Sequence, residues 1–175
     1  RINENGLIVF ECRENGFANL CVINLDGTGF RQLTEGNHRD EYPGLIFPEI
    51  NDQGQIVFAC NFNGRDYAQD LCVVNADGSG LREILQMRSK PVTQNSFSRP
   101  HINNQGLLLY ECTDPIREEK YTTVCTSNFD GSGQQVFEFS DEFQFISELA
   151  FIRDETIVYR CPYGYCLSSL DGQPL

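Results

Sequence analysis

The apolar residues of this chain occur in short runs separated by polar turns, and the pattern returns about every fifty residues. The runs are rich in β-branched and aromatic residues, as in Ile56-Val57-Phe58, and they lack the spacing of an amphipathic helix. Four repeats can be distinguished. Their approximate bounds are 1–44, 45–95, 96–144 and 145–175.

Each repeat contains four candidate strands, and the second repeat gives the clearest set. They cover residues 45–51, 55–60, 71–75 and 81–85. An Asp-Gly pair lies between the third and fourth strands of every repeat, where the glycine supplies the positive φ of a tight hairpin. The pairs are Asp26-Gly27, Asp77-Gly78, Asp130-Gly131 and Asp171-Gly172. Each repeat is therefore predicted to fold as a four-stranded antiparallel meander.

The middle strands of each repeat show little alternation of apolar and polar residues, as Val57, Val73 and Val74 illustrate. Strands of this composition are buried on both faces, as they are in sheets that stack face to face around an axis. The sequence thus predicts an all-β fold, a four-bladed β-propeller of antiparallel meander blades that forms one domain over residues 1–175. The last blade is expected to be incomplete.

Each repeat also carries two cysteines, one at the end of the second strand and one in the third. Residues directly opposite each other on antiparallel strands have Cβ atoms about 4.5–5.5 Å apart, which a disulfide can bridge with modest adjustment. Pairing within each repeat is the only connectivity that all four copies share. The predicted disulfides are Cys12–Cys21, Cys60–Cys72, Cys112–Cys125 and Cys161–Cys166.

Metal or haem binding is the competing interpretation of the cysteines. The chain has no Cys-x-x-Cys pair and only two histidines, His38 and His101, so neither a metal site nor another cofactor is expected. Paired cysteines in a chain of this length indicate an oxidising compartment, meaning an extracellular, cell-surface or periplasmic location. We expect Arg1 to begin a processed or trimmed form, because no signal peptide precedes it.

The charge of the chain excludes some classes of partner. The formal net charge is −12, and a basic surface that would attract nucleic acid or an anionic membrane is not expected. No apolar run approaches the roughly 20 residues that a membrane-spanning helix needs.

Residues 75–80, Asn75-Ala76-Asp77-Gly78-Ser79-Gly80, close a segment that resembles the TolB-type (WD40-like) β-propeller repeat. Residues 23–34 are similar to the tail of the same repeat, and 50–58 and 102–106 resemble Asn-x-x-Gly repeats of secreted bacterial surface proteins. We expect the chain to be a secreted tandem-repeat variant of this family, in which the paired cysteines add one disulfide per blade. Such propellers serve as interaction platforms, gates on peptidases and parts of surface proteins, so the resemblance implies a fold more than a function.

Two features depart from that family, whose members usually have about six or more blades and mostly lack cysteines at these positions. The fourth repeat also stops before a full outer strand, and an uncovered strand edge is a template for another chain. We therefore expect a neighbouring subunit to complete blade four, giving a homo-oligomer or, if the contact does not close, a polymer. The alternative is a stable monomer whose edge is blunted by Pro174. Gly172, Pro174 and Leu175 are the candidate contact residues.

A search for catalytic residues finds little, and the chain is not expected to be an enzyme. Arg1, Glu49 and His101 occupy equivalent places at the start of successive repeats. If the inner strands line an axial channel, these side chains are the candidates to converge there. The simpler interpretation is that they are ordinary polar residues at wet positions. No serine or cysteine is free to act with His101 once the cysteines are paired.

Aromatic residues in the loops between second and third strands are the remaining candidates for contacts. They are Phe17, Phe62, Tyr67, Tyr121, Tyr163 and Tyr165. Together they predict an apolar patch on one rim, which in the absence of tryptophan favours a protein contact over a carbohydrate site. The sequence thus predicts a non-catalytic propeller that acts as a self-assembling or scaffold protein, a subunit of an extracellular filament or oligomer. A propeller that binds a carbohydrate or peptide on its rim or in its channel is the alternative.

Overall fold

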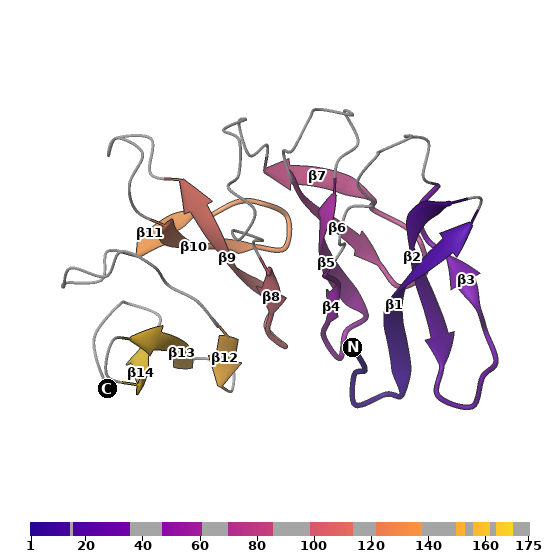
Figure 1. The fold of residues 1–175 in the computed structure, drawn as a ribbon, viewed down its shortest axis with the longest axis horizontal. Helices are drawn as coiled ribbons and strands as arrows, with labels where there is room; N and C mark the ends of the chain where they lie inside the picture. Colours follow the sequence, from indigo (N-terminus) through magenta and orange to yellow (C-terminus); the bar gives the residue numbers. More distant parts are fainter. Residues whose placement is uncertain are drawn as a thin grey trace. The chain divides into compact units, whose positions relative to one another are not determined.

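The computed structural model describes most of the chain. The described residues are 1–14, 16–35, 47–60, 70–85, 99–113, 122–137, 150–152, 156–161 and 164–169. Within these ranges the regular structure is entirely strand, and the strands form four antiparallel sheets. Figure 1 shows that each sheet is built from strands that follow one another in the chain. We call the sheets blades 1 to 4 in chain order. The chain divides into two compact units, Arg1–Pro100 and His101–Leu175.

Blade 1 contains the strands β1 (Leu7–Glu14), β2 (Phe17–Asn24) and β3 (Arg31–Gln32) in that order. Ile2 forms an additional antiparallel bridge to Ile8. The innermost position of the predicted meander is therefore occupied by the segment around Ile2.

The hairpin between β1 and β2 is tighter than the sequence interpretation assumed. The sequence predicts that Phe17 lies in a loop, but the ladder continues until Glu14 pairs with Phe17. Phe17 is consequently a strand residue and not a loop aromatic. The physical reason is the dipeptide Asn15-Gly16, a sequence that favours two-residue hairpin turns, in which Gly16 adopts a φ of 88°.

Blade 2 matches the predicted four-stranded meander. Its strands are β4 (Glu49–Ile50), β5 (Gln55–Cys60), β6 (Asp70–Asn75) and β7 (Arg82–Leu85). The second strand has the predicted bounds, and the third and fourth differ by one residue at their starts. The inner strand is shorter than the predicted 45–51. The segment at Phe47 is not a strand, so within the described residues the inner strand begins at Glu49.

Blades 3 and 4 make up the second unit. Blade 3 contains β8 (His101–Ile102), β9 (Leu107–Thr113), β10 (Thr122–Asn128) and β11 (Gln135–Phe137). Blade 4 contains β12 (Ala150–Ile152), β13 (Thr156–Cys161) and β14 (Gly164–Ser169). Residues 170–175 lie outside the described part, so the completion of blade 4 by another chain stays a prediction.

The Asn-x-Asp-Gly turns have the same internal hydrogen bonds in blades 1, 2 and 3. In blade 2 the Asn75 side-chain amide donates to the Ser79 hydroxyl at 3.0 Å, and the Asp77 carboxylate accepts from the Ser79 backbone N–H at 2.8 Å. Gly78 has a φ of 88°, a conformation that L side chains rarely adopt. Hydrogen bonds from the side chain and backbone of Ser79 lower the pKa of Asp77, which is fully exposed.

The predicted disulfides are confirmed in the first two blades. Cys12–Cys21 and Cys60–Cys72 each have Cα atoms 5.8 Å apart. The expectation that the two cysteines lie directly opposite each other is wrong, because Cys60 pairs in the ladder with Asp70 and not with Cys72. A right-handed twist shortens one diagonal across a hairpin, which allows the offset pair to be bonded.

In blades 3 and 4 the register repeats this offset. Cys112 pairs in the ladder with Thr123, two residues before Cys125, and Cys161 stands in the same relation to Cys166. Cys125 and Cys166 are disulfide-bonded, and the side chains of the first cysteines of these blades are outside the described part. Among the described side chains there is no free cysteine.

A search of the described residues for long apolar helices finds none that could span a membrane.

Candidate binding surface

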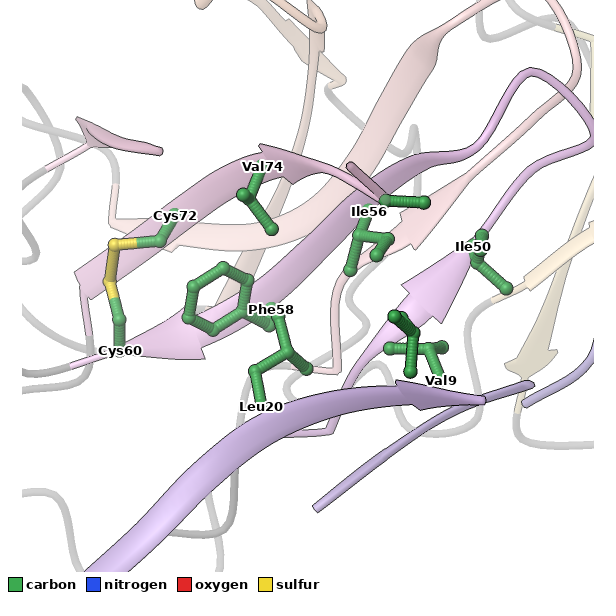
Figure 2. Close-up of a cluster of buried hydrophobic side chains, with 10 residues drawn as sticks. Val9, Leu20, Ile50, Ile56, Phe58, Cys60, Cys72 and Val74 are labelled. Atoms are coloured by element: carbon green, nitrogen blue, oxygen red, sulfur yellow. A yellow bond between two sulfur atoms is a disulfide. The ribbon is translucent and has the colours of Figure 1, made fainter. Parts of the chain in front are cut away.

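A cluster of apolar side chains joins blade 1 to blade 2 (Figure 2). Blade 1 contributes Val9, Leu20 and Val22, which are fully buried. Blade 2 contributes residues of its inner and middle strands and one residue of the turn after β6. They are Ile50, Ile56, Phe58, Cys60, Cys72 and Val74 on the strands, and Ala76 in the turn. We call the side of blade 1 in this joint a covering face and the side of blade 2 a receiving face.

Polar contacts between two turns reinforce this joint. The Asn3 side-chain amide donates to the Asn51 carbonyl at 3.0 Å, and the Asn5 amide donates to the Asp52 carbonyl at 2.7 Å. The Glu4 backbone N–H donates to the Asp52 carboxylate at 2.8 Å. The Asn-x-x-Gly turns of successive repeats thus bind each other directly, which explains why the repeat retains polar residues there.

Blade 1 has a receiving face of its own, on the opposite side of its sheet from Val9. The register defines it, because Phe10 pairs with Cys21 in blade 1 as Phe58 pairs with Cys72 in blade 2. The equivalent residues are Ile2, Ile8, Phe10, Cys12, Cys21, Ile23 and Leu25. Blade 1 therefore repeats the apolar surface that blade 2 buries.

The two receiving faces differ sharply in exposure. Ile50 and Ala76 of blade 2 are 8% and 9% exposed, whereas Ile2 and Leu25, their equivalents in blade 1, are 54% and 69% exposed. Phe30 extends the same surface, with its ring centroid 6.5 Å from that of Phe10, and it is also exposed. Exposed apolar patches of this kind commonly mark sites of protein interaction. We name Ile2, Ile8, Phe10, Ile23, Leu25 and Phe30 the blade-1 receiving surface.

The second unit contains another joint of the same design. Leu109 and Val124 of blade 3 pack against Ile157 and Tyr159 of blade 4, and all four are buried. Leu109 and Val124 occupy the covering-face positions of their blade, and Ile157 and Tyr159 occupy receiving-face positions. The joint between blades is therefore a repeated structural unit.

Blade 4 presents an exposed covering face. The positions that blade 1 uses against blade 2 are filled in blade 4 by Val158, Tyr165 and Leu167. Tyr165 is 68% exposed and Leu167 is 40% exposed. Tyr165 lies in β14, so it is a strand residue and not the loop aromatic that the sequence interpretation assumed.

A small cleft lies in the first unit, beside the inner strands. It has a volume of about 290 Å³, and its lining includes Arg1, Phe47, Glu49 and Arg99. An Arg1 guanidinium nitrogen lies 2.8 Å from a Glu49 carboxylate oxygen, and the Arg99 guanidinium carbon lies 5.0 Å from the centroid of the Phe47 ring. Phe47 has a φ of 40°, in the left-handed region that a phenylalanine seldom adopts. The cleft combines charged and aromatic groups that a small polar ligand could contact.

The structure brings two of the three predicted channel residues together. Arg1 and Glu49 form the ion pair described above, and Val9 exchanges backbone hydrogen bonds with Arg1. His101 is buried in β8 of the second unit, at the register position equivalent to Glu49. Their convergence in a channel stays a prediction.

The remaining predicted contact residues lie outside the described residues. They are Phe62, Tyr67, Tyr121, Tyr163, Gly172, Pro174 and Leu175. Among the residues that are described, no group of three His, Cys, Asp or Glu side chains could hold a metal ion. The sequence interpretation missed the blade-1 receiving surface. The available clue was that Ile8, Phe10 and Ile23 repeat, in the first blade, the residues that blade 2 places in a joint.

No protein-family model matches the sequence, and neither does a curated protein sequence. Solved structures do match. The nidogen/laminin complex contains a chain that is 13% identical, with a TM-score of 0.59 over 99% of this chain and 60% of that chain. TolB from Acinetobacter baumannii is 13% identical, with a TM-score of 0.60 over 97% of this chain and 39% of that chain. The β-propeller domain of the Trilobed protease from Pyrococcus furiosus, which has an open velcro topology, is 17% identical, with a TM-score of 0.61 over 99% and 54%.

These similarities establish the fold class. The chain has an all-β fold whose four meander sheets fit four blades of a β-propeller, similar to TolB and to other propellers. It spans between about two fifths and three fifths of the length of the three chains described above. At such low identity the similarity extends to the fold and not to the activities of those proteins.

Proposed function

We propose that this chain is a non-catalytic propeller that acts as a scaffold and self-associates through the blade-1 receiving surface. The observation that carries the proposal is the exposure of Ile2 and Leu25, whose equivalents in blade 2 are buried by a neighbouring blade. Removing apolar area of this kind from water stabilises a complex by about 25 cal/mol per Å² before the costs of association. A sheet face of another chain is the partner that fits this surface best.

An extracellular or periplasmic location is part of this proposal. The bonded cysteines in all four blades, among them Cys72 and Cys125, support it, since disulfides persist in oxidising compartments. The net charge of −12 favours solubility in such a compartment.

The similar structures are compatible with more than one class of function. One of them belongs to a complex of two proteins, nidogen and laminin, and another is a domain of a protease. The first supports a propeller surface in protein recognition. For this chain the exposed receiving surface favours protein binding over catalysis.

Sedimentation velocity on the disulfide-intact chain tests the proposal. The wild-type mass is expected to rise above 19.9 kDa with concentration, while Leu25→Glu stays at 19.9 kDa. Val136→Glu is the matched control, because Val136 is an exposed apolar residue on the outer strand of blade 3. A wild-type chain that remains monomeric at every concentration would contradict the proposal, as would equal association of all three proteins.

Binding of a small ligand is the second candidate function, and the cleft beside Arg1 and Arg99 favours it. Its volume of about 290 Å³ suits a peptide terminus or a single sugar unit. Ligand-observed NMR with short peptides and monosaccharides tests this idea. Signals that broaden with the wild type and sharpen with Arg99→Ala would support it, and no broadening across the panel would exclude these ligands.

A further inference from the structure

We infer that the cleft of the first unit binds the free carboxylate at the end of a peptide whose last side chain is apolar. The inference rests on the second candidate function, binding of a small ligand in this cleft, and it adds the chemical class of that ligand. The residues that line the cleft all belong to the first unit, Arg1–Pro100, so the site is defined within one compact unit.

The positive and negative side chains around the cleft are unequally matched. Two carboxylates line it, and each lies beside an arginine. Glu49 contacts Arg1 at 2.8 Å, and Glu11 contacts Arg13 at 3.1 Å. Arg99 is exposed, and no carboxylate of the described residues lies within ion-pair distance of its guanidinium. The lining thus keeps one positive charge that its own carboxylates do not offset, and this charge favours an anionic ligand.

The ring of Phe47 holds the Arg99 guanidinium in position. The guanidinium carbon lies 5.0 Å from the ring centroid, a cation–π distance that restricts the motion of a long side chain. The φ of 40° places Phe47 in a strained backbone region, and such residues are concentrated at ligand sites. A guanidinium stacked on a ring keeps its edge N–H groups available, and their planar fork matches the two oxygens of a carboxylate. The expected contact is therefore a bidentate pair between Arg99 and a ligand carboxylate.

The remaining walls of the cleft are largely apolar. Phe10 and Pro48 are half-buried, and Pro100 is buried. The volume of about 290 Å³ is at the small end for a ligand site and suits one terminal residue. A sugar would bring several hydroxyls that each need a polar partner, whereas both carboxylates of the lining are already engaged by arginines. A carboxylate next to an apolar side chain is what the end of a peptide supplies.

Titration of the ¹⁵N-labelled, disulfide-intact chain with N-acetylglycyl-leucine tests the inference. The free acid is expected to shift the backbone amide signals of Phe47 and Glu49, and the corresponding C-terminal amide should bind about fivefold more weakly. Arg99→Ala should lower the affinity for the acid to that for the amide. Arg99→Lys, which keeps the charge and loses the fork, should lie between Arg99→Ala and the wild type.

Arg31→Ala is the matched control. Arg31 is an exposed arginine of the same unit that does not line the cleft, so its removal changes the net charge by the same amount. This variant should bind the acid as the wild type does. Equal weakening in Arg31→Ala and Arg99→Ala would overturn the inference, because overall charge would then explain the binding.

The other outcomes separate the inference from the candidate function on which it rests. Equal affinity for the acid and its amide would overturn the inference and leave ligand binding in the cleft standing. Glucuronate that binds as tightly as the peptide would overturn the peptide assignment in favour of an acidic sugar. If neither these compounds nor neutral monosaccharides shift the signals of Phe47 and Glu49, the inference and the candidate function fail together.

Discussion

Cys60 and Cys72 are bonded along a diagonal of the β5–β6 hairpin, since Cys60 lies opposite Asp70 in the ladder and Cys72 lies opposite Phe58. In the hairpins of the other three blades, the residue opposite the first cysteine in the ladder is likewise two residues away from the second cysteine. A bond along this diagonal resists untwisting of the hairpin, because untwisting would lengthen the separation of 5.8 Å between the Cα atoms. The disulfides therefore brace the twist on which face-to-face packing of blades depends.

Removal of one disulfide should lower stability without abolishing the fold. The bond between Cys60 and Cys72 joins residues 12 apart in sequence, for which the chain-entropy treatment gives about 3 kcal/mol. We expect the double substitution Cys60→Ser with Cys72→Ser to lower the free energy of unfolding by that amount in urea titrations. The pair Cys12→Ser with Cys21→Ser serves as the matched comparison. An unchanged free energy of unfolding would contradict the bracing role.

Two equivalent phenylalanines should differ in their contribution to stability. Phe58 is buried in the joint between blades, so Phe58→Ala should cost about 3–5 kcal/mol. Phe10 occupies the same position on the receiving surface of blade 1 and is only half-buried, so Phe10→Ala should cost less than half as much in the monomer. Chemical unfolding at low protein concentration measures both. Equal losses would mean that the blade-1 face is covered.

The Asp-Gly turns predict that the free energy of unfolding decreases at acidic pH. Hydrogen bonds from the Thr28 hydroxyl and backbone N–H lower the pKa of Asp26 in the folded chain. The stabilisation is therefore present above the pKa of the unfolded chain, about 4, and is lost as the pH falls through the lower folded value. In Asp26→Asn the unfolding midpoint should depend less steeply on pH than in the wild type, when it is measured between about pH 2 and pH 6. A dependence on pH that is as steep in Asp26→Asn as in the wild type would contradict this assignment.

Self-association should strengthen when salt is added. Each copy carries a formal net charge of −12, so two copies repel each other at low ionic strength. The screening length falls from about 30 Å at 0.01 M to about 10 Å at 0.1 M salt. The dissociation constant from sedimentation equilibrium should therefore decrease several-fold over this range. Weaker association at higher salt would indicate contacts between charges instead of the apolar surface.

Much of the fold could be predicted from local sequence. The Asp-Gly turns located the hairpins because only a few residues tolerate the required backbone, and β5 ended at Cys60 as predicted. The tight hairpin after Glu14 was missed although Asn15-Gly16 is itself a hairpin sequence. The diagonal position of Cys60 and Cys72 could not be predicted, because it depends on the twist of the sheet and not on residue type.

The candidate site was harder to predict, for a physical reason. Ile8 and Phe10 have the same apolar pattern as Ile56 and Phe58, so local sequence does not reveal which pair is covered. Coverage depends on a neighbouring blade, which is distant in the chain. The exposure of Ile2 is therefore a property of the folded blades and not of the local sequence.

The most direct test of the account is a photo-crosslink from the blade-1 receiving surface. Leu25, which is 69% exposed, is replaced by benzoylphenylalanine in a mixture of ¹⁴N- and ¹⁵N-labelled chains, and the linked peptides are identified by mass spectrometry. The account predicts mixed-isotope crosslinks, because this surface contacts a second chain. Crosslinks confined to chains of one isotope would contradict it.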